Sequence, residues 1–267
     1  MPKAKPPIPV FSTPIIETHC HLDYLDADQL PETLARCAAV GIDRIVTIAV
    51  SPDNLATVRQ LAAMHDAVWA TQGVHPHEAE AFTADAAGQI AAAAADAKVV
   101  AVGEIGLDYY YDHADRAVQR RVFETQLELA IDAELPIVVH TREADDDTMA
   151  ILRNATARLS RKGVIHSFTS GRALAEYCLS EGFMLGFNGI ATFNKADNVR
   201  EIVALTPDDQ LVIETDSPYL TPVPYRGVPN APFYLPFVAE FLARFRDQPV
   251  EIFLATVRAN SERLFAF

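Results

Sequence analysis

The chain has few of the features that mark secreted or membrane proteins. It contains only 3 cysteines, Cys20, Cys37 and Cys178, with no CxxC pair. This low, odd number favours a reduced, cytoplasmic setting over a disulfide framework or a thiolate metal site. No run of about 20 apolar residues is present, so we expect no transmembrane helix. The proline-rich opening MPKAKPPIPVFSTP lacks the apolar core of a secretory signal.

Basic residues are also scarce. The chain has 22 lysines and arginines against 36 acidic residues, a formal net charge of -14. Proteins that bind duplex DNA along its length need a broad basic surface, which this composition argues against. A substrate that carries phosphate is not excluded, because metal ions in a cleft can supply local positive charge.

Short apolar runs alternate with helix-like segments along most of the chain. We count eight such runs, at residues 14–20, 44–50, 67–74, 98–106, 136–141, 163–168, 182–189 and 210–217. Apolar runs followed by helix-sized connections are typical of buried parallel strands. Eight of them predict an α/β fold, a (β/α)8 TIM barrel, rather than an open doubly wound sheet. We expect residues 1–14 to form a tail and residues 15–267 a single catalytic domain.

Local signals predict several helix boundaries. Ser51-Pro52 is a favourable helix start, and Gly41, Gly163 and Gly182 stand where helices should end.

The first apolar run ends in a pair of histidines, His19 and His21, that flank Cys20. Alternate residues of a strand point to the same face, so both imidazoles should point together. An isolated pair of this kind is more often an ordinary polar feature than a metal site.

Polar residues suited to metal binding recur at the ends of the other runs, where a barrel of this type places its catalytic groups. Only His65 and His113 of the 8 histidines fall elsewhere, and we expect both on the surface. A set of imidazoles and carboxylates without thiolates suits Zn, Mn or Mg. The predicted metal ligands are His19, His21, Glu104, His140, His166 and Asp216. Six ligands exceed the need of one catalytic metal, so we expect two divalent ions bridged by Glu104.

Several segments in series resemble signatures of the TatD-type metal-dependent deoxyribonucleases, which are amidohydrolase-like TIM barrels. They are ETHCHLD, GVHPHEA, GEIGLDYYYD, PIVVHTRE, GVIHSFTSG and ETDSPYLTPVPYRG, and they run in order from about Glu17 to Asn230. The resemblance implies hydrolysis of phosphodiester bonds in DNA. It also implies that one ion is held by His19, His21, Glu104 and Asp216, and the other by Glu104, His140 and His166.

The chain departs from the family pattern at two places. Glu17 stands where the family usually has Asp. After Arg226-Gly227 the family usually reads Lys, Arg, Asn, Glu, Pro, whereas this chain has Val228, Pro229 and Ala231 around Asn230. The second departure removes charge from the rim and bears on substrate preference.

The expected chemistry is a displacement at phosphorus by a hydroxide held between two ions about 3.5–4 Å apart. Glu104 would bridge the ions. The family resemblance implies that Asp216 both touches the first ion and acts as general base. Glu214, two residues before Asp216, is predicted to support a ligand histidine from behind. The alternative for Glu214 is a side chain turned to water.

Residues near the strand ends are candidates for substrate binding. Arg142 could grip a phosphate or pair with the acidic run at 143–147, and these alternatives are nearly balanced. Arg226 and Lys195 are similar loop candidates, and His75 is a substrate-binding candidate. His77 is a weaker one, because Pro76 interrupts the strand. The tyrosines at 109–111 could stack on a base or simply pack their loop.

Three functions from different classes follow. The favoured one is a cytoplasmic DNase with DNA as substrate, acting as an exonuclease on single strands or ends, because tracking along a duplex would need a basic groove. The first alternative is a hydrolase of a small amide, lactone or phosphoester on the same barrel. The second is a metal-bound binding protein without turnover.

Overall fold

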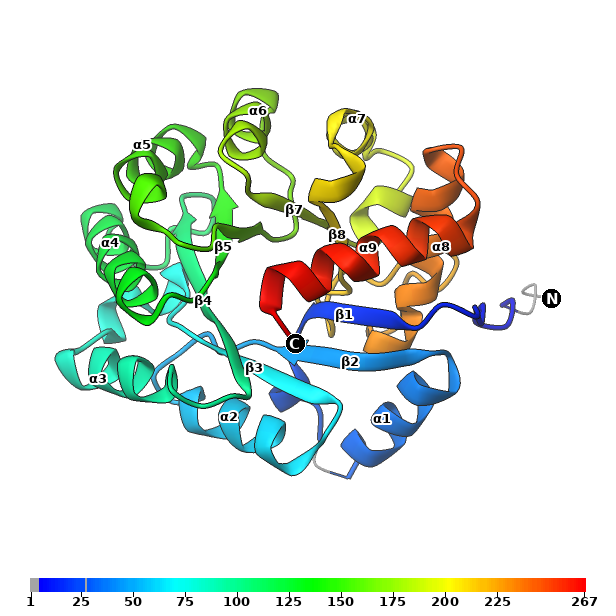
Figure 1. Cartoon of the computed structure of the whole chain (residues 1–267), viewed down its shortest axis with the longest axis horizontal. Coiled ribbons are helices and arrows are strands. Elements are labelled where there is room, and N and C mark those ends of the chain that lie inside the picture. Colours follow the sequence, from blue (N-terminus) through cyan, green and yellow to red (C-terminus); the bar gives the residue numbers. More distant parts are fainter. Residues whose placement is uncertain (1–4, 27) are drawn as a thin grey trace.

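The computed structural model describes residues 5–26 and 28–267, so residues 1–4 of the predicted tail lie outside the described residues. Eight parallel strands form one sheet in chain order, β1 to β8. Helices surround the strands in Figure 1, and the sheet curls into a nearly closed barrel. The predicted (β/α)8 TIM barrel is confirmed.

Each predicted apolar run overlaps one strand. The strands are β1 (Ile15–Cys20), β2 (Ile42–Thr47), β3 (Val68–Gln72), β4 (Val99–Asp108), β5 (Ile137–Arg142), β6 (Gly163–Ile165), β7 (Met184–Phe187) and β8 (Leu211–Ile213). All residues of β1 and β4 are buried. Burial on both faces explains why most residues of these strands are apolar and why no solvent-facing polar residue alternates with them. Their polar residues, Glu17, Thr18, His19, Glu104 and Asp108, are themselves buried.

The connecting helices pack their apolar faces on the outside of the sheet. They are α1 (Leu30–Ala39), α2 (Leu55–Met64), α3 (Ala84–Ala93), α4 (Arg116–Ala133), α5 (Asp145–Ala155), α6 (Arg172–Ser180), α7 (Asp197–Leu205) and α8 (Leu235–Phe245). A further helix, α9 (Val250–Phe265), follows α8. Within residues 5–26 and 28–267, no helix has both the length and the apolarity that a membrane crossing needs.

Two of the predicted helix boundaries are wrong. Helix α2 begins at Leu55 rather than at Ser51-Pro52, because the Asn54 side chain accepts hydrogen bonds from the amides of Val50 and Ser51 and holds a turn there. Gly163 does not end a helix but begins β6, with a φ of 126°. A Cβ atom at Gly163 would overlap the carbonyl oxygen of Ile137, so close strand pairing requires glycine.

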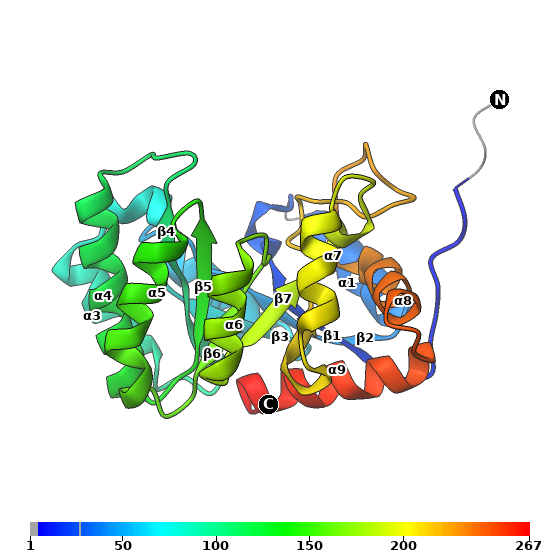
Figure 2. The same ribbon diagram turned by 90° about the horizontal axis from the view of Figure 1, so that it is seen from above.

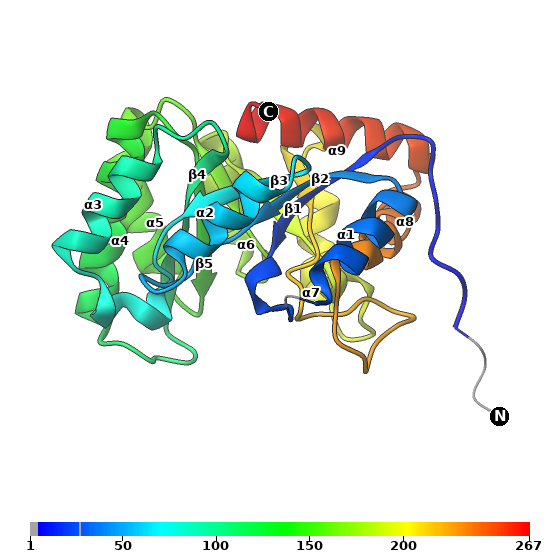
Figure 3. The ribbon, with the colours of Figure 1, turned by 90° about the horizontal axis from the view of Figure 1, so that it is seen from below.

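Helix α9 closes one end of the barrel. Its last residues, Leu264 and Phe265, pack with Val46, Val138 and Val212 in the barrel interior. Figures 2 and 3 show α9 lying across this end, and in Figure 2 the arrowhead of β5 points away from it. The carboxyl ends of the strands therefore open at the opposite end, where this fold places its catalytic groups.

The barrel closes between β1 and β8 through side chains as well as backbone. Thr18 Oγ1 donates to the carbonyl oxygen of Ile213 (2.9 Å). Glu17 Oε1 accepts from the backbone amides of His19 (3.1 Å) and Thr215 (2.9 Å). Burial raises the pKa of Glu17 to about 8, which makes the carboxyl group largely neutral at pH 7. Glu17 is therefore a buried link across the seam.

The residues before β1 are tied to the body of the protein. The amides of Ser12 and Thr13 donate to the Glu251 carboxylate on α9 (2.9 Å each). Further along the segment, Lys5 Nζ donates to the carbonyl oxygen of Tyr225, and the Tyr225 hydroxyl donates to that of Pro6 (2.8 Å). This segment thus connects the bottom of the barrel with the loop that follows β8.

The seam contact generates a stability prediction. Glu17→Ala should lower the free energy of unfolding by about 2–6 kcal/mol, because it leaves two buried amides without an acceptor at about 1–3 kcal/mol each. Glu17→Gln keeps an acceptor oxygen and should cost much less. Urea denaturation followed by circular dichroism measures both. An alanine variant as stable as the wild type would show that the seam does not depend on this side chain.

Candidate metal centre and active site

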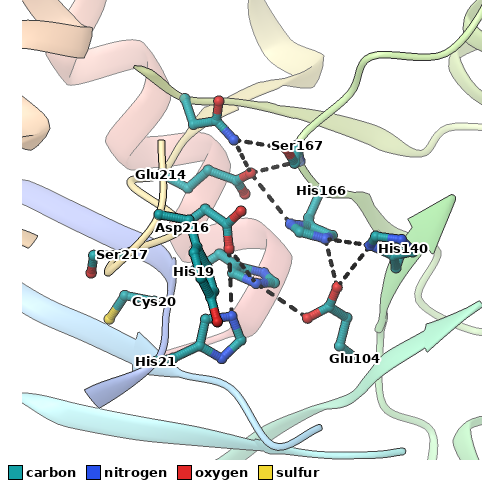
Figure 4. A network of polar contacts seen from close by, with 12 residues as sticks. His19, Cys20, His21, Glu104, His140, His166, Ser167, Glu214, Asp216 and Ser217 are labelled. Carbon is teal, nitrogen blue, oxygen red and sulfur yellow. Dashed lines mark hydrogen bonds and ion pairs between the residues drawn. The ribbon is translucent and has the colours of Figure 1, made fainter. Parts of the chain in front are cut away.

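The six predicted ligands converge at the open end of the barrel, around the Glu104 carboxylate. Its two oxygens face in different directions, as Figure 4 shows. Oε2 faces His19, and Oε1 faces His140 and His166. Glu104 comes from β4, which lies between the strands that supply the other residues in the barrel order.

The first group of donors crosses the seam between β1 and β8. His19 Nε2 lies 3.4 Å from Glu104 Oε2 and 3.5 Å from Asp216 Oδ1. His21 Nε2 lies 3.4 Å from the same Asp216 oxygen. Although β1 ends at Cys20, His19 and His21 still approach one carboxylate, as their spacing predicts.

The second group lies on β5 and at the end of β6. His140 Nδ1 lies 3.1 Å and His166 Nε2 lies 2.7 Å from Glu104 Oε1. The two ring nitrogens are 3.4 Å apart. His140 Nε2 faces a second carboxylate at 3.0 Å, so with the proton on Nε2 the Nδ1 lone pair would point into the cluster.

The donor atoms fit divalent metal binding. Among the described residues, both ring nitrogens of His19 and Nδ1 of His21 are buried without a hydrogen-bond partner. Leaving such atoms unpaired is costly in a protein interior. A cation among His19, His21 and Glu104, whose donor atoms all lie within 4.8 Å of one another, would pair the inward-facing nitrogens. The mixed nitrogen and oxygen set suits Zn, Mn or Mg.

The electrostatics of the cluster keep its carboxylates ionised. Burial alone would raise the pKa of Glu104, but the imidazoles of His166, His75 and His19 hold that pKa well below its usual value. Burial opposes ionisation of Asp216 too, and contact with His21, aided by His19 and His166, lowers its pKa. Two ionised carboxylates beside four imidazoles form a strong site for cations.

Glu214 lies behind His166 and does not turn to water. Its Oε1 accepts from the Ser167 amide (2.6 Å) and lies 3.5 Å from His166 Nδ1. A Cβ atom at Gly186 would lie 2.6 Å from Glu214 Oε2, so glycine on β7 makes the room for this carboxylate. Glu214 thus lies where the sequence places a supporting residue.

Asp108 is a site residue that the sequence analysis missed. Its Oδ2 lies 3.0 Å from Nε2 of both His140 and His77, and its Oδ1 accepts from the amides of Tyr110 and Tyr111. Burial opposes its ionisation, but the hydrogen bonds from His140 and His77 lower its pKa. The signal was present: Asp108 lies four residues after Glu104 on one strand, hence on the same face.

His75 and His77 both reach the site despite Pro76, with ring centroids 4.4 Å apart. His75 Nδ1 accepts from the His77 amide (3.1 Å), so the ring carries its proton on Nε2. That nitrogen lies 3.5 Å from Glu104 Oε1. His75 therefore presents a hydrogen-bond donor rather than a lone pair. The two histidines expected on the surface differ, because His65 is half-buried while His113 is exposed, 4.6 Å from the His77 ring.

Arg142 forms no ion pair with the acidic run at 143–147 in the described part of the chain. Its guanidinium lies over the rings of Tyr110 (4.0 Å) and Tyr111 (4.8 Å). It lines a cavity of about 610 Å³ together with most of the cluster. Tyr109 does not line this cavity; its hydroxyl donates to Asp147 (2.6 Å).

Arg226 and Lys195 lie outside this cavity. Both line a neighbouring pocket formed by the segments after β7 and β8. The structure therefore brings His75 and Arg142 next to the cluster, whereas Arg226 and Lys195 line the neighbouring pocket.

A TIM barrel with histidines and carboxylates gathered at the carboxyl ends of its strands defines the class of metal-dependent hydrolases. The model of one family, TatD related DNase, matches residues 16–266. The chain belongs to this family, and it is a metal-dependent hydrolase.

Relatives cover nearly the whole chain. The uncharacterized metal-dependent hydrolase YabD of Bacillus subtilis is 35% identical over 94% of this chain and 98% of its own length. The 3'-5' ssDNA/RNA exonuclease TatD of Citrobacter rodentium is 33% identical, over 88% and 90%. The crystal structure of YjjV, a TatD homologue from Escherichia coli, superposes with a TM-score of 0.90 at 31% identity, covering 95% of this chain and 98% of that one.

The position of Asp108 generates a prediction about metal affinity. Asp108→Asn keeps the size of the side chain but removes the charge that orients His140, so divalent-metal affinity should fall by about 10–100-fold. Isothermal titration calorimetry with Mn²⁺ or Zn²⁺ measures this. Asp132→Asn, an exposed change on α4, is the matched control. Unchanged affinity in Asp108→Asn would show either that His140 is not a metal ligand or that Asp108 does not orient it.

Proposed function

We propose that this protein hydrolyses phosphodiester bonds of DNA, as an exonuclease on single strands or ends, with two divalent ions per chain. The observation that carries the proposal is the Glu104 carboxylate, whose separate oxygens face two different sets of imidazoles. A carboxylate shared in this way is suited to bridging a pair of ions. The activity in the name of the Citrobacter rodentium relative supports the choice of nucleic acid as substrate.

In this proposal His19, His21, Glu104 and Asp216 hold one ion, and Glu104, His140 and His166 hold the other. When bound, two such ions supply positive charge to the attacking and leaving oxygens of an in-line displacement. Mg, Mn and Zn all suit these donors.

The chain's own groups divide the remaining work. Asp216 faces the cavity with a lowered pKa, so it is ionised and able to take a proton from the attacking water. Glu214 holds His166 from behind. The Nε2–H of His75 is a donor for a phosphate oxygen, and the Arg142 guanidinium beside the same cavity is a second one.

The shape and charge of the mouth favour a chain end over a duplex. The cavity is about 610 Å³ and is bordered by the exposed rings of Tyr24, Tyr111 and Tyr219. Exposed aromatic rings can stack on unpaired bases, which a duplex does not offer. With a net charge of -14, the surface as a whole does not attract duplex DNA along its length.

The proposal predicts more than one ion per chain. Protein reconstituted with Mn²⁺ or Zn²⁺ and freed of excess metal should contain two ions per chain by elemental analysis. Glu104→Ala should bind fewer, because both groups lose an oxygen, while the exposed change Glu124→Gln on α4 should not. Saturation at one ion in the wild type would contradict the bridged pair.

Activity tests the substrate and the proton acceptor together. The metal-loaded protein should degrade single-stranded DNA faster than duplex DNA and faster than small amides, lactones or phosphoesters. Asp216→Asn should lower turnover by at least about 10²–10⁴-fold, because asparagine neither carries the charge nor accepts the proton. The exposed variant Asp53→Asn should retain full activity.

The other outcomes have distinct meanings. Preference for a small ester or amide over every nucleic acid would replace the proposal with the small-molecule hydrolase. Metal binding without turnover of any substrate would favour the binding protein. Near-normal DNA hydrolysis by Asp216→Asn at saturating metal would remove Asp216 from the mechanism.

A further inference from the structure

A second pocket adjoins the cavity of the metal cluster. It measures about 330 Å³ and is built from η4 (Gly189–Thr192), the start of α7 and the loop after β8. Thr169 and Ile190 line both this pocket and the cavity of the cluster. The two pockets therefore meet at Thr169 and Ile190, so the second pocket lies within reach of a polymer held at the cluster.

The second pocket carries positive charge only. Among the described residues, its charged lining consists of Lys195 and Arg226, without a carboxylate. The Arg226 guanidinium rests on the Phe193 ring at 3.8 Å. In the part of the chain that the structure describes, neither cation lies within 4 Å of an acidic group, whereas Arg200 on α7 pairs with Asp197. Two cations unpaired in so acidic a protein are available to an anion.

A third pocket, beside α5, has the reverse charge. It measures about 680 Å³ and shares Arg142 and Thr169 with the central cavity, so Thr169 separates its side of the mouth from the second pocket. Its lining contains four carboxylates, those of Glu143, Asp145, Asp146 and Asp147, against the single guanidinium of Arg142. A polyanion would be repelled on this side and attracted on the other.

The second pocket also has an apolar wall suited to a sugar or base. Phe193, Ile190 and Val223 line it beside the two cations. An apolar wall with cations at its edge is the combination by which proteins hold single-stranded nucleic acid. The loop that carries Arg226 is fixed from outside by Lys5 and Pro6 through Tyr225.

We propose that this pocket is a subsite for the nucleotide adjacent to the cleaved bond, with Lys195 and Arg226 binding its phosphate. The subsite rests on the proposed function and adds a direction to it. The strand leaves the cluster on the side of β7 and β8, and the acidic pocket beside α5 holds no continuing chain. A substrate with one more phosphate on the favoured side is bound more tightly than a single phosphodiester.

The experiment compares substrates that differ in reach. Lys195→Ala, Arg226→Ala and the double variant are assayed on a single-stranded tetranucleotide and on thymidine 5'-p-nitrophenyl phosphate. Each single change should raise KM for the tetranucleotide about 10- to 100-fold, as expected when one charged hydrogen bond is removed, and the effect on the small diester should be at least threefold smaller. Arg244→Ala, which removes an exposed arginine from the far end of α8, should change neither.

Binding provides a second readout. Fluorescence anisotropy with a labelled, phosphorothioate-linked tetranucleotide should show weaker binding to the double variant. The log–log slope against salt should become shallower by about 0.7 for each phosphate that the variant no longer neutralises. Asp145→Asn and Asp146→Asn on the acidic side should leave the tetranucleotide affinity the same or higher.

The failures of the two proposals are distinguishable. Hydrolysis of DNA by the wild type with equal KM in the double variant would overturn the subsite and leave the proposed function intact. Equal losses on both substrates would also overturn it. If the wild type hydrolyses no DNA, the proposed function fails, and unchanged tetranucleotide binding by the double variant would then overturn the subsite as well.

Discussion

The closure of the barrel between β1 and β8 is the constraint on which the candidate site depends. His19 and His21 belong to one side of this seam and Asp216 to the other. The amide of Asp216 donates to the carbonyl oxygen of His19, and that of His21 to Ser217, both at 2.9 Å. The same backbone bonds that close the sheet therefore set the distance between the first group of donors. The fold and the metal site are therefore coupled at this seam, because a change that loosens the strand pairing would also move these donors apart.

Much of the fold and the position of the ligands could be predicted from the sequence, because both follow from simple periodicities. Apolar runs of strand length recur eight times, and their ends carry His19, Glu104, His140 and the other donors, which the barrel brings together. Their roles as ligands stay predictions. The role of Asp108 was missed, although its position on the strand was visible, because that role is to contact His140 on a different strand. The contacts of Arg142 could not be predicted, because residue spacing does not show whether its guanidinium packs on tyrosine rings or pairs with carboxylates.

The negative net charge reflects the outer surface of the protein more than the mouth of the barrel. Many arginines on the outer helices are paired with acids, as Arg158 is with Glu128 and Arg172 with Glu176. These exposed pairs contribute little to stability and cancel in the field that a distant ligand meets. At the mouth, Arg142 and Arg226 lie against aromatic rings, and neither forms an ion pair with a carboxylate of the described residues. Aromatic support positions a guanidinium without neutralising it.

The segment near the amino terminus contacts a loop beside the site, whereas the carboxyl-terminal residue lies at the other end of the barrel. Lys5 and Pro6 form hydrogen bonds with Tyr225, the residue before Arg226. Phe267 packs on Trp69 at the end of the barrel that α9 closes, away from the mouth (Figure 2). An affinity tag or surface linkage ahead of Lys5 therefore pulls on a loop at the mouth, whereas one after Phe267 leaves that loop alone. Immobilised or fused forms meant for kinetic work should be attached through the carboxyl end.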